Sequence, residues 1–246
     1  MIPTCHPRWL GRTEFGAALS LQKELTARRA ANEIPNTLLL LEHPPTFSVG
    51  IGGHREHLLV NQQELAQRNV AYHAVDRGGS VTYHGPGQLV CYPILKLNEP
   101  GQGYHHYLKL LESVIIRSLA GFKVRAFRGR GQPGVWVFTG NARPNGSELL
   151  QSDHFQMAQI AAIGVKLDQN HVTSHGFSIN INPDLTFFDL IVPRGLPGCR
   201  VTSLVEVVGK PIEVGCLLEP VIQSFCQVFE MERITAEPSA PVLLAS

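Results

Sequence analysis

Several hallmarks of common protein classes are missing from this sequence. Its five cysteines form no CxxC pair, which argues against a zinc site on paired thiolates. An odd, widely spaced set of cysteines is typical of reduced thiols in a reducing compartment. No HExxH pattern occurs, and His171 and His175 lie on an expected strand about 13 Å apart, too far to share one metal ion. We therefore expect no metal site, and we expect most of the 11 histidines at polar surface or loop positions.

Strong charge and long apolar runs are missing as well. The formal net charge is +1 and no block of five basic residues occurs, so we expect neither a nucleic-acid partner nor a membrane partner. The longest aliphatic runs, such as Leu38–Leu41, are far too short to span a bilayer. The first residues lack the apolar run of a secretory signal. These features predict a cytoplasmic protein, or a protein of the mitochondrial matrix if the host is eukaryotic.

What is present indicates a folded α+β domain. The 246 residues, 43% of them hydrophobic, suit one domain over 1–246. Expected strands come in runs with few helices between them. The expected helical regions include Tyr104–Leu119 and Lys210–Met231. This order favours a mixed or antiparallel sheet packed with helices. The polar range 139–155 is predicted to be a mobile insertion, and 235–246 a frayed tail.

The first segment that could take part in ligand binding or catalysis is Arg77–Gln88, RGGSVTYHGPGQ. Its glycines allow positive φ and a close approach of the backbone to a ligand. Arg77 offers a planar, charged donor group. No Gly-Lys-Ser/Thr ending and no GxGxxG pattern occurs, so the segment is not a phosphate loop. Both a ligand cradle and an ordinary hairpin turn remain open interpretations.

A second segment reads as a β-hairpin. Two β-rich runs, Gln159–Leu167 and Val172–Ile181, flank the turn signal Asp168–Asn170. Gly164 inside the first run indicates a bulge or a close backbone approach. Paired strands that contain glycine can form a slot for an extended alkyl chain, although a plain core hairpin is the alternative.

A third segment, Ile191–Leu204, is a loop rich in proline and glycine. It holds Cys199, with Arg194 and Arg200 nearby to favour the thiolate. The alternative is an inert cysteine, which is the more common situation.

Read in order, these motifs resemble one family. LLLLEHPPTFSVG, RGGSVTYHGPGQLVCYPIL, GVWV, IAAIGVK, VTSHGFSININPDL, IVP-x-G and VTSL are similar to the lipoyl(octanoyl) transferases of lipoate biosynthesis, from about Leu10 to Phe229. The resemblance implies the fold of the biotin and lipoyl protein ligases. It also implies two-step transfer of an octanoyl group, through an enzyme thioester, from octanoyl-acyl carrier protein to a lysine of a lipoyl domain. It implies no cofactor.

The resemblance also implies partners and a binding site. The partners are octanoyl-acyl carrier protein, the lipoyl domains of 2-oxoacid dehydrogenases and the glycine cleavage H protein. The acyl pocket implied by position consists of Arg77, Gly78, Gly79, Ser80, Val81, Thr82, Tyr83, His84, Ala162, Ile163, Gly164, Gly176, Phe177 and Ser178.

The sequence departs from the family at its catalytic pair. The nucleophilic cysteine of the Pro-Cys-Gly motif is replaced by Arg194, and the assisting lysine by Gln159. Cys199, in the same loop, and Lys166, on the same strand as Gln159, are the candidate catalytic replacements. Lys166 is seven residues from Gln159, so both share a strand face only if a bulge at Gly164 intervenes.

Three functions therefore stay open at this point. The first is octanoyl transfer with Cys199 as nucleophile. The second is a catalytically impaired relative that binds acyl carrier protein or lipoyl domains. The third is an ATP-dependent lipoate or biotin ligase, suggested by a passing likeness of Arg128–Gly131 to a biotin ligase loop, which we interpret as a surface turn.

Overall fold

The structure is a computed structural model that describes residues 2–97, 103–129, 132–139, 156–195 and 198–235. Of the predicted insertion 139–155, only Thr139 falls within these ranges, as the last residue of a strand. Of the predicted tail 235–246, only Thr235 does so. The remaining residues of both segments lie outside the described part of the chain.

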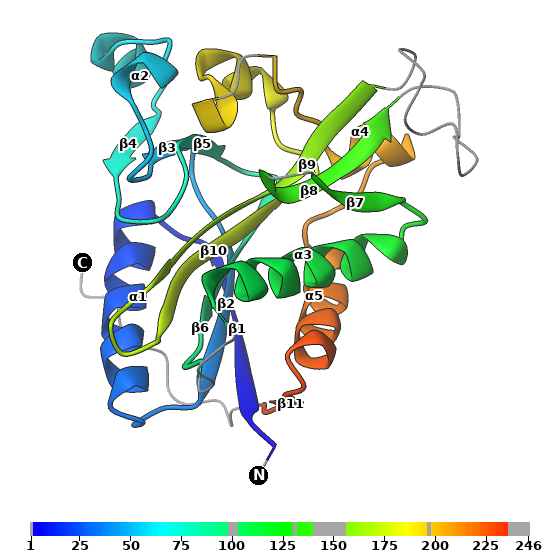
Figure 1. The fold of residues 1–246 in the computed structure, drawn as a ribbon. Coiled ribbons are helices and arrows are strands. Elements are labelled where there is room, and N and C mark those ends of the chain that lie inside the picture. The colour runs from blue at the N-terminus through cyan, green and yellow to red at the C-terminus, as the bar shows by residue number, and fades with distance from the viewer. Residues whose placement is uncertain (1, 98–102, 130–131, 140–155, 196–197, 236–246) are drawn as a thin grey trace.

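The strands form an eight-stranded and a three-stranded sheet (Figure 1). They are β1 (Thr4–Arg12), β2 (Asn36–Glu42), β3 (Thr46–Val49), β4 (Ala71–Ala74), β5 (Val81–His84), β6 (Gln88–Ile94), β7 (Ala126–Gly129), β8 (Gln132–Thr139), β9 (Gln156–Leu167), β10 (Thr173–Asn180) and β11 (Glu232–Arg233). The large sheet has the order β11-β1-β2-β6-β10-β9-β8-β7, and the small sheet β4-β3-β5. In the large sheet β1 runs parallel to β2 and β11, and the other pairs are antiparallel, so the predicted mixed sheet is confirmed.

Helices cover both faces of the large sheet. They are α1 (Phe15–Ala30), α2 (Gln62–Gln67), α3 (Tyr104–Ala120), α4 (Leu204–Val208) and α5 (Gly215–Val228), with 3₁₀ turns η1 (Arg55–His57), η3 (Leu185–Leu190) and η4 (Pro193–Gly195). Helix α1 packs against β6 and β10 on one face, whereas α3 and α5 pack together on the other (Figure 1). No helix in the described ranges is long and apolar enough to cross a membrane.

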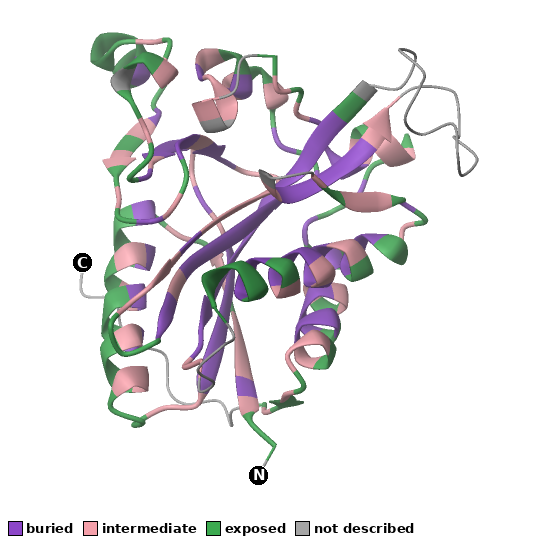
Figure 2. Ribbon diagram, viewed as in Figure 1, coloured by how far each residue is buried: buried purple, intermediate pink, exposed green. Residues whose placement is uncertain are grey.

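The unbroken aliphatic run of β2 is explained by burial on both faces. Leu38 and Leu40 pack in the cluster formed with α3 and α5, and Leu39 and Leu41 in the cluster formed with α1. Successive strand residues point to opposite faces, so a strand covered on both sides is apolar at every position. Figure 2 shows the central strands as buried and the outer side of α1 as exposed.

Some elements differ from the sequence-based expectations. Strand β1 was not predicted, because it mixes polar residues with Pro7 and lies half exposed near the edge of the sheet. Strand β5 forms inside the segment that we interpreted as a glycine-rich loop. Helix α5 begins only at Gly215, inside the predicted helical range Lys210–Met231, and it contains Pro220.

The double-sided core gives a stability prediction. We expect Leu40→Ala to lower the free energy of unfolding by about 2–5 kcal/mol, because Leu40 is fully buried and its removal leaves a cavity. Leu59→Ala is the matched control, since Leu59 is 58% exposed and should change stability by no more than about 0.5 kcal/mol. Urea unfolding measures both, and equal losses in the two variants would contradict the packing described above.

Candidate active site

A cavity of about 300 Å³ lies between the two sheets. Strands β6, β9 and β10 form one wall, and β3, β5 and the segment 77–80 form the other. Phe15 from α1, Tyr104 from α3 and Pro133 from β8 complete the lining. This volume is at the lower end of the roughly 300–1,000 Å³ typical of small-molecule sites. The cavity can therefore hold one small, elongated group.

The floor of the cavity is hollow because small residues face each other there. Gly164 of β9 pairs directly with Gly176 of β10, and Ala162 pairs with Ser178. Strand alternation places these four on one face, while Phe177 between them packs in the core cluster of the other face. The structure thus contains the slot between glycine-containing strands that the sequence suggested.

The segment 77–80 lies directly on this floor. Gly78 N–H donates a hydrogen bond of 2.9 Å to Val165 O, and a Cβ atom on Gly164 would lie only 2.9 Å from Gly78 O. A close backbone approach therefore explains Gly164. The alternative of a bulge at Gly164 is wrong, because β9 and β10 pair continuously through it. The register shift of β9 lies instead opposite Val135 and Trp136.

Arg77 brings a positive charge to the cavity wall. Its Nη2 donates to Ser48 O at 2.6 Å and its Nη1 to Gly78 O at 3.0 Å. Burial lowers the pKa of the Arg77 guanidinium to about 10, so it stays charged at neutral pH. No carboxylate in the described ranges forms an ion pair with it. Carbonyl and hydroxyl oxygens stabilise this charge instead.

Three of the 11 histidines, His43, His84 and His175, are buried, although we expected most histidines at polar surface or loop positions. His43 Nδ1 lies 2.7 Å from Thr13 O and must donate to it, because a carbonyl oxygen only accepts. His43 Nε2 therefore accepts from the Tyr92 hydroxyl at 2.8 Å. Burial lowers the pKa of His43 to about 4, so the ring is neutral at pH 7.

His84 is held in the same way on the cavity wall. The amide of Gln88 donates through Nε2 to Tyr83 O, which turns its Oε1 toward His84 Nδ1 at 2.7 Å. His84 Nδ1 therefore carries the proton, and Nε2 accepts from the Ser48 hydroxyl at 3.2 Å. Burial, and then the neighbouring His43, lower the pKa of His84 to about 3. Hydrogen bonds at both nitrogens explain how the polar rings of His43 and His84 can be buried.

Lys166 and His175 converge on Asp76. Lys166 Nζ lies 2.6 Å from Asp76 Oδ2, and His175 Nε2 lies 3.0 Å from Asp76 Oδ1. The hydrogen bond from Lys166 is the main cause that lowers the pKa of Asp76 to about 2. His175 has a left-handed backbone conformation with a φ of 55°. Its backbone N–H donates a hydrogen bond to Gln22 Oε1 at 2.8 Å.

All the predicted substrate-binding residues except Tyr83 line the cavity. Tyr83 points away because β5 alternates, and it packs between Phe47 and Phe188 in a separate apolar cluster. The cavity residues that sequence reasoning missed are Phe15, Ser48, Val90, Tyr92, Tyr104, Pro133 and His175. The alternation of QLVCYPIL would have placed Val90 and Tyr92 on one face.

The structure does not bring Lys166 and Cys199 together. Gln159 N–H donates to Arg200 O at 2.8 Å, which places the Cys199 loop beside the start of β9. Lys166 lies seven residues further along this strand, roughly 23 Å at about 3.3 Å per residue. It binds Asp76 there.

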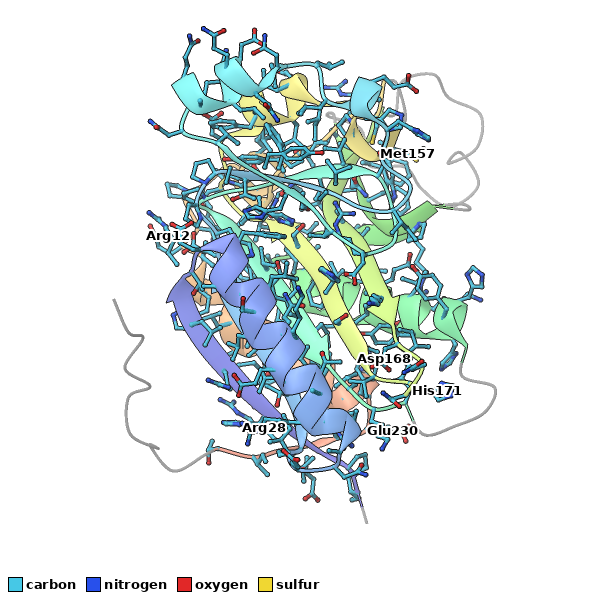
Figure 3. All side chains as sticks on the ribbon, turned by 90° about the vertical axis from the view of Figure 1, so that its left-hand side faces the viewer. Arg12, Arg28, Met157, Asp168, His171 and Glu230 are labelled. Atoms are coloured by element: carbon cyan, nitrogen blue, oxygen red, sulfur yellow. The ribbon has the colours of Figure 1, made fainter. Side chains whose placement is uncertain are left out.

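Figure 3 shows the length of β9. Met157, near the start of the strand, lies in the upper part of the molecule, and Asp168, the residue after its end, lies in the lower half. Cys199 is not among the residues that line the cavity.

The two positions that the resemblance assigns to the catalytic pair lie on separate elements. Arg194 belongs to η4, and Gln159 is a buried residue of β9. Gln159 is not among the described residues that line the cavity. Neither an arginine nor a glutamine can form a thioester.

Comparison with known proteins now assigns the class. The family model "Lipoyl protein ligase A/B catalytic domain" matches residues 15–226. The chain therefore belongs to the lipoyl protein ligase A/B catalytic-domain family. Within it the chain is similar to octanoyltransferases: it is 41% identical to that of Chloroflexus aggregans, over 92% of this chain and 96% of the relative. With that of Geobacter metallireducens it shares 39% identity, over 94% and 98% of the chains.

Solved structures agree on the fold. A bipartite lipoate protein ligase from Thermoplasma acidophilum superposes with a TM-score of 0.66 at 11% identity, covering 96% of this chain and 87% of that one. P. falciparum LipL1 in complex with lipoate gives 0.64 at 14% identity, covering 94% and 66%. The expected lipoyl-ligase-like α+β fold and the motif-based resemblance to octanoyltransferases are thus confirmed.

The buried neutral histidines predict a pH dependence of stability. His43 ordinarily titrates at 6.5 but at about 4 in the fold, so below pH 6.5 the unfolded chain binds a proton that the folded chain does not. The contribution of neutral His43 to the free energy of unfolding is fully present above pH 6.5 and is lost as the pH falls toward 4. We expect His43→Gln to reduce this slope by up to about 1.4 kcal/mol per pH unit. Urea unfolding at pH 7, 6 and 5 measures the slope, and an unchanged slope would contradict the prediction.

Proposed function

We propose that this protein transfers an octanoyl group from octanoyl-acyl carrier protein to a lysine of a lipoyl domain, the first step in making the lipoate cofactor. The observation that supports this best is the cavity, because three segments distant in sequence combine there into one narrow slot. The acceptors we propose are the lipoyl domains of 2-oxoacid dehydrogenases and the glycine cleavage H protein. The bacterial relatives are compatible with action in the cytoplasm.

The chemistry of the lining fits an acyl chain with a polar head. Ala162, Gly164 and Val90 offer an apolar surface without protruding polar atoms. Arg77 lies on the opposite wall and offers a donor to the carbonyl oxygen of a thioester. An alkyl chain in the slot gains about 0.8 kcal/mol for each CH₂ removed from water, which favours a medium-length chain over acetyl.

The alternative of a relative that binds without turnover rests on Arg194 and Gln159 alone. Curated relatives at 41% and 42% identity are octanoyltransferases, which favours an active acyltransferase. An ATP-dependent ligase draws support only from folds at 11–14% identity, and such a likeness concerns the fold alone.

A direct assay tests the proposal. The protein is incubated with octanoyl-acyl carrier protein and an unmodified lipoyl domain, without ATP, and the lipoyl domain is weighed by mass spectrometry. We expect a gain of one octanoyl group on its lysine. A gain that requires ATP and free octanoate would favour a ligase. No gain with folded protein and intact carrier binding would favour the binding-only relative.

The slot also predicts chain-length selectivity. In Ala162→Leu the added side chain fills the floor of the cavity next to Gly164, so the octanoyl group no longer fits. We expect kcat/KM for octanoyl transfer to fall by about 10-fold or more, as for a mismatch of one or two methylenes. Butyryl-carrier protein is the control in the same variant, because a short chain still fits. Equal losses for both chain lengths would place the acyl chain elsewhere.

A further inference from the structure

A hydroxyl and an imidazole meet at the cavity wall. Ser80 Oγ lies 2.7 Å from His57 Nδ1. Ser80 is a lining residue of the cavity, and His57 comes from η1, a separate segment of the chain. The distance is within the roughly 2.6–3.2 Å that joins a nucleophile to its base in covalent catalysis.

The direction of this hydrogen bond is fixed by a neighbouring backbone group. His54 N–H lies 3.3 Å from the same His57 Nδ1, and a backbone N–H can only donate. His57 Nδ1 is therefore the unprotonated nitrogen of a neutral ring, and the Ser80 hydroxyl donates its hydrogen to it. In this arrangement the base already accepts a hydrogen bond through the proton that the hydroxyl must lose when it attacks.

The ring of His57 is also held in place. Val192 N–H donates to His57 O at 2.8 Å, and a Cβ atom on Gly195 would lie 2.7 Å from His57 Cε1. Gly195 is the last residue of η4, the turn that contains Arg194, and Val192 immediately precedes this turn. The pair therefore lies beside the position where the family has its cysteine.

A second hydroxyl near a histidine is less suitable. Ser48 Oγ lies 3.2 Å from His84 Nε2, but it also accepts from Arg77 Nη2 at 3.0 Å and from Arg77 Nε at 3.3 Å. Its lone pairs are thus engaged, and Ser48 has no solvent-exposed surface. Ser80 is the better candidate.

We propose that Ser80 accepts the octanoyl group as an oxyester, with His57 as general base; this inference rests on the octanoyl transfer proposed above. Ser80 Oγ bonds to the thioester carbonyl carbon as its proton passes to His57 Nδ1. The C–S bond breaks, and the carrier thiolate takes that proton and leaves as a thiol. Gly195 is a positioning residue that keeps the ring against Ser80.

The second step releases the group to the acceptor. The neutral amine of the lipoyl-domain lysine bonds to the ester carbonyl carbon and gives a proton to His57. The C–Oγ bond breaks, and Ser80 Oγ takes the proton back from His57. An amide forms, Ser80 and His57 return to their starting states, and no oxidant or reductant is needed.

Intact-mass spectrometry after incubation with octanoyl-acyl carrier protein alone tests the intermediate. We expect one octanoyl group on the peptide that contains Ser80, stable to neutral hydroxylamine and released by alkaline hydroxylamine, as for an oxyester. Ser80→Ala should abolish this adduct, and Ser80→Cys should convert it to a thioester that neutral hydroxylamine cleaves. His57→Gln should slow adduct formation by about 10²–10⁴-fold. Ser20→Ala, an exposed serine of α1, is the control that should leave the adduct unchanged.

The positioning role has a matched pair of variants. Gly195 and Gly198 both have left-handed φ, at +71° and +77°, but no described atom lies within 4 Å of a Cβ on Gly198. Alanine at either position carries the same backbone strain, and only Gly195→Ala displaces His57. We expect Gly195→Ala to lower the rate of adduct formation at saturating carrier protein without raising the half-saturating concentration, while Gly198→Ala retains the rate.

The outcomes separate this inference from the proposed function. Transfer to the lipoyl domain with no adduct on Ser80, or full transfer by folded Ser80→Ala, would overturn the serine ester and leave octanoyl transfer standing. An adduct lost in Cys199→Ala but kept in Ser80→Ala would also overturn it. Neither adduct nor transfer by the folded wild-type protein would overturn both. The circular dichroism and melting temperature of each variant establish that it is folded.

Discussion

The hydrogen bond from Gly78 N–H to Val165 O is the contact on which the site depends. It holds the segment 77–80, which leads into β5 of the small sheet, against strand β9 of the large one. The approach is possible because Gly164 has no side chain, and because Gly164 and Gly176 are paired across the two strands. One backbone contact thus sets the height of the cavity and the positions of both Arg77 and Ser80 above its floor.

Polar side chains gather on one side of the cavity. Their hydrogen-bond partners and their burial decide which of them are charged and which are neutral. His43 and His84 are neutral because they are buried and each ring has a donor and an acceptor as partners. Arg77 remains charged because oxygens of Ser48 and Gly78 surround its guanidinium. The neutral imidazoles of His43 and His84 thus lie near the fixed positive charge of Arg77.

Local patterns were sufficient for the mixed α+β architecture, whereas most of the slot residues followed from the resemblance to the octanoyltransferases. Gly164 within a predicted hairpin suggested a slot between glycine-containing strands, which β9 and β10 form. Residues whose role depends on distant partners were not predictable. Tyr83 and His84 are neighbours in one motif, yet only the pairing of β5 with β3 decides which of them faces the cavity. His57 carries no local signal, since its meeting with Ser80 is made by tertiary packing alone.

None of the described residues that line the cavity is a cysteine, and Cys91 of the neighbouring β6 faces the core on the far side of the sheet. Thiolates are the side chains that peroxide converts to sulfenic and higher acids, and alkylating agents act on the same atoms. A hydroxyl is not oxidised in this way. The described lining of this cavity therefore presents no thiol to oxidants or thiol reagents, and its side chains do not depend on a reducing environment to stay intact.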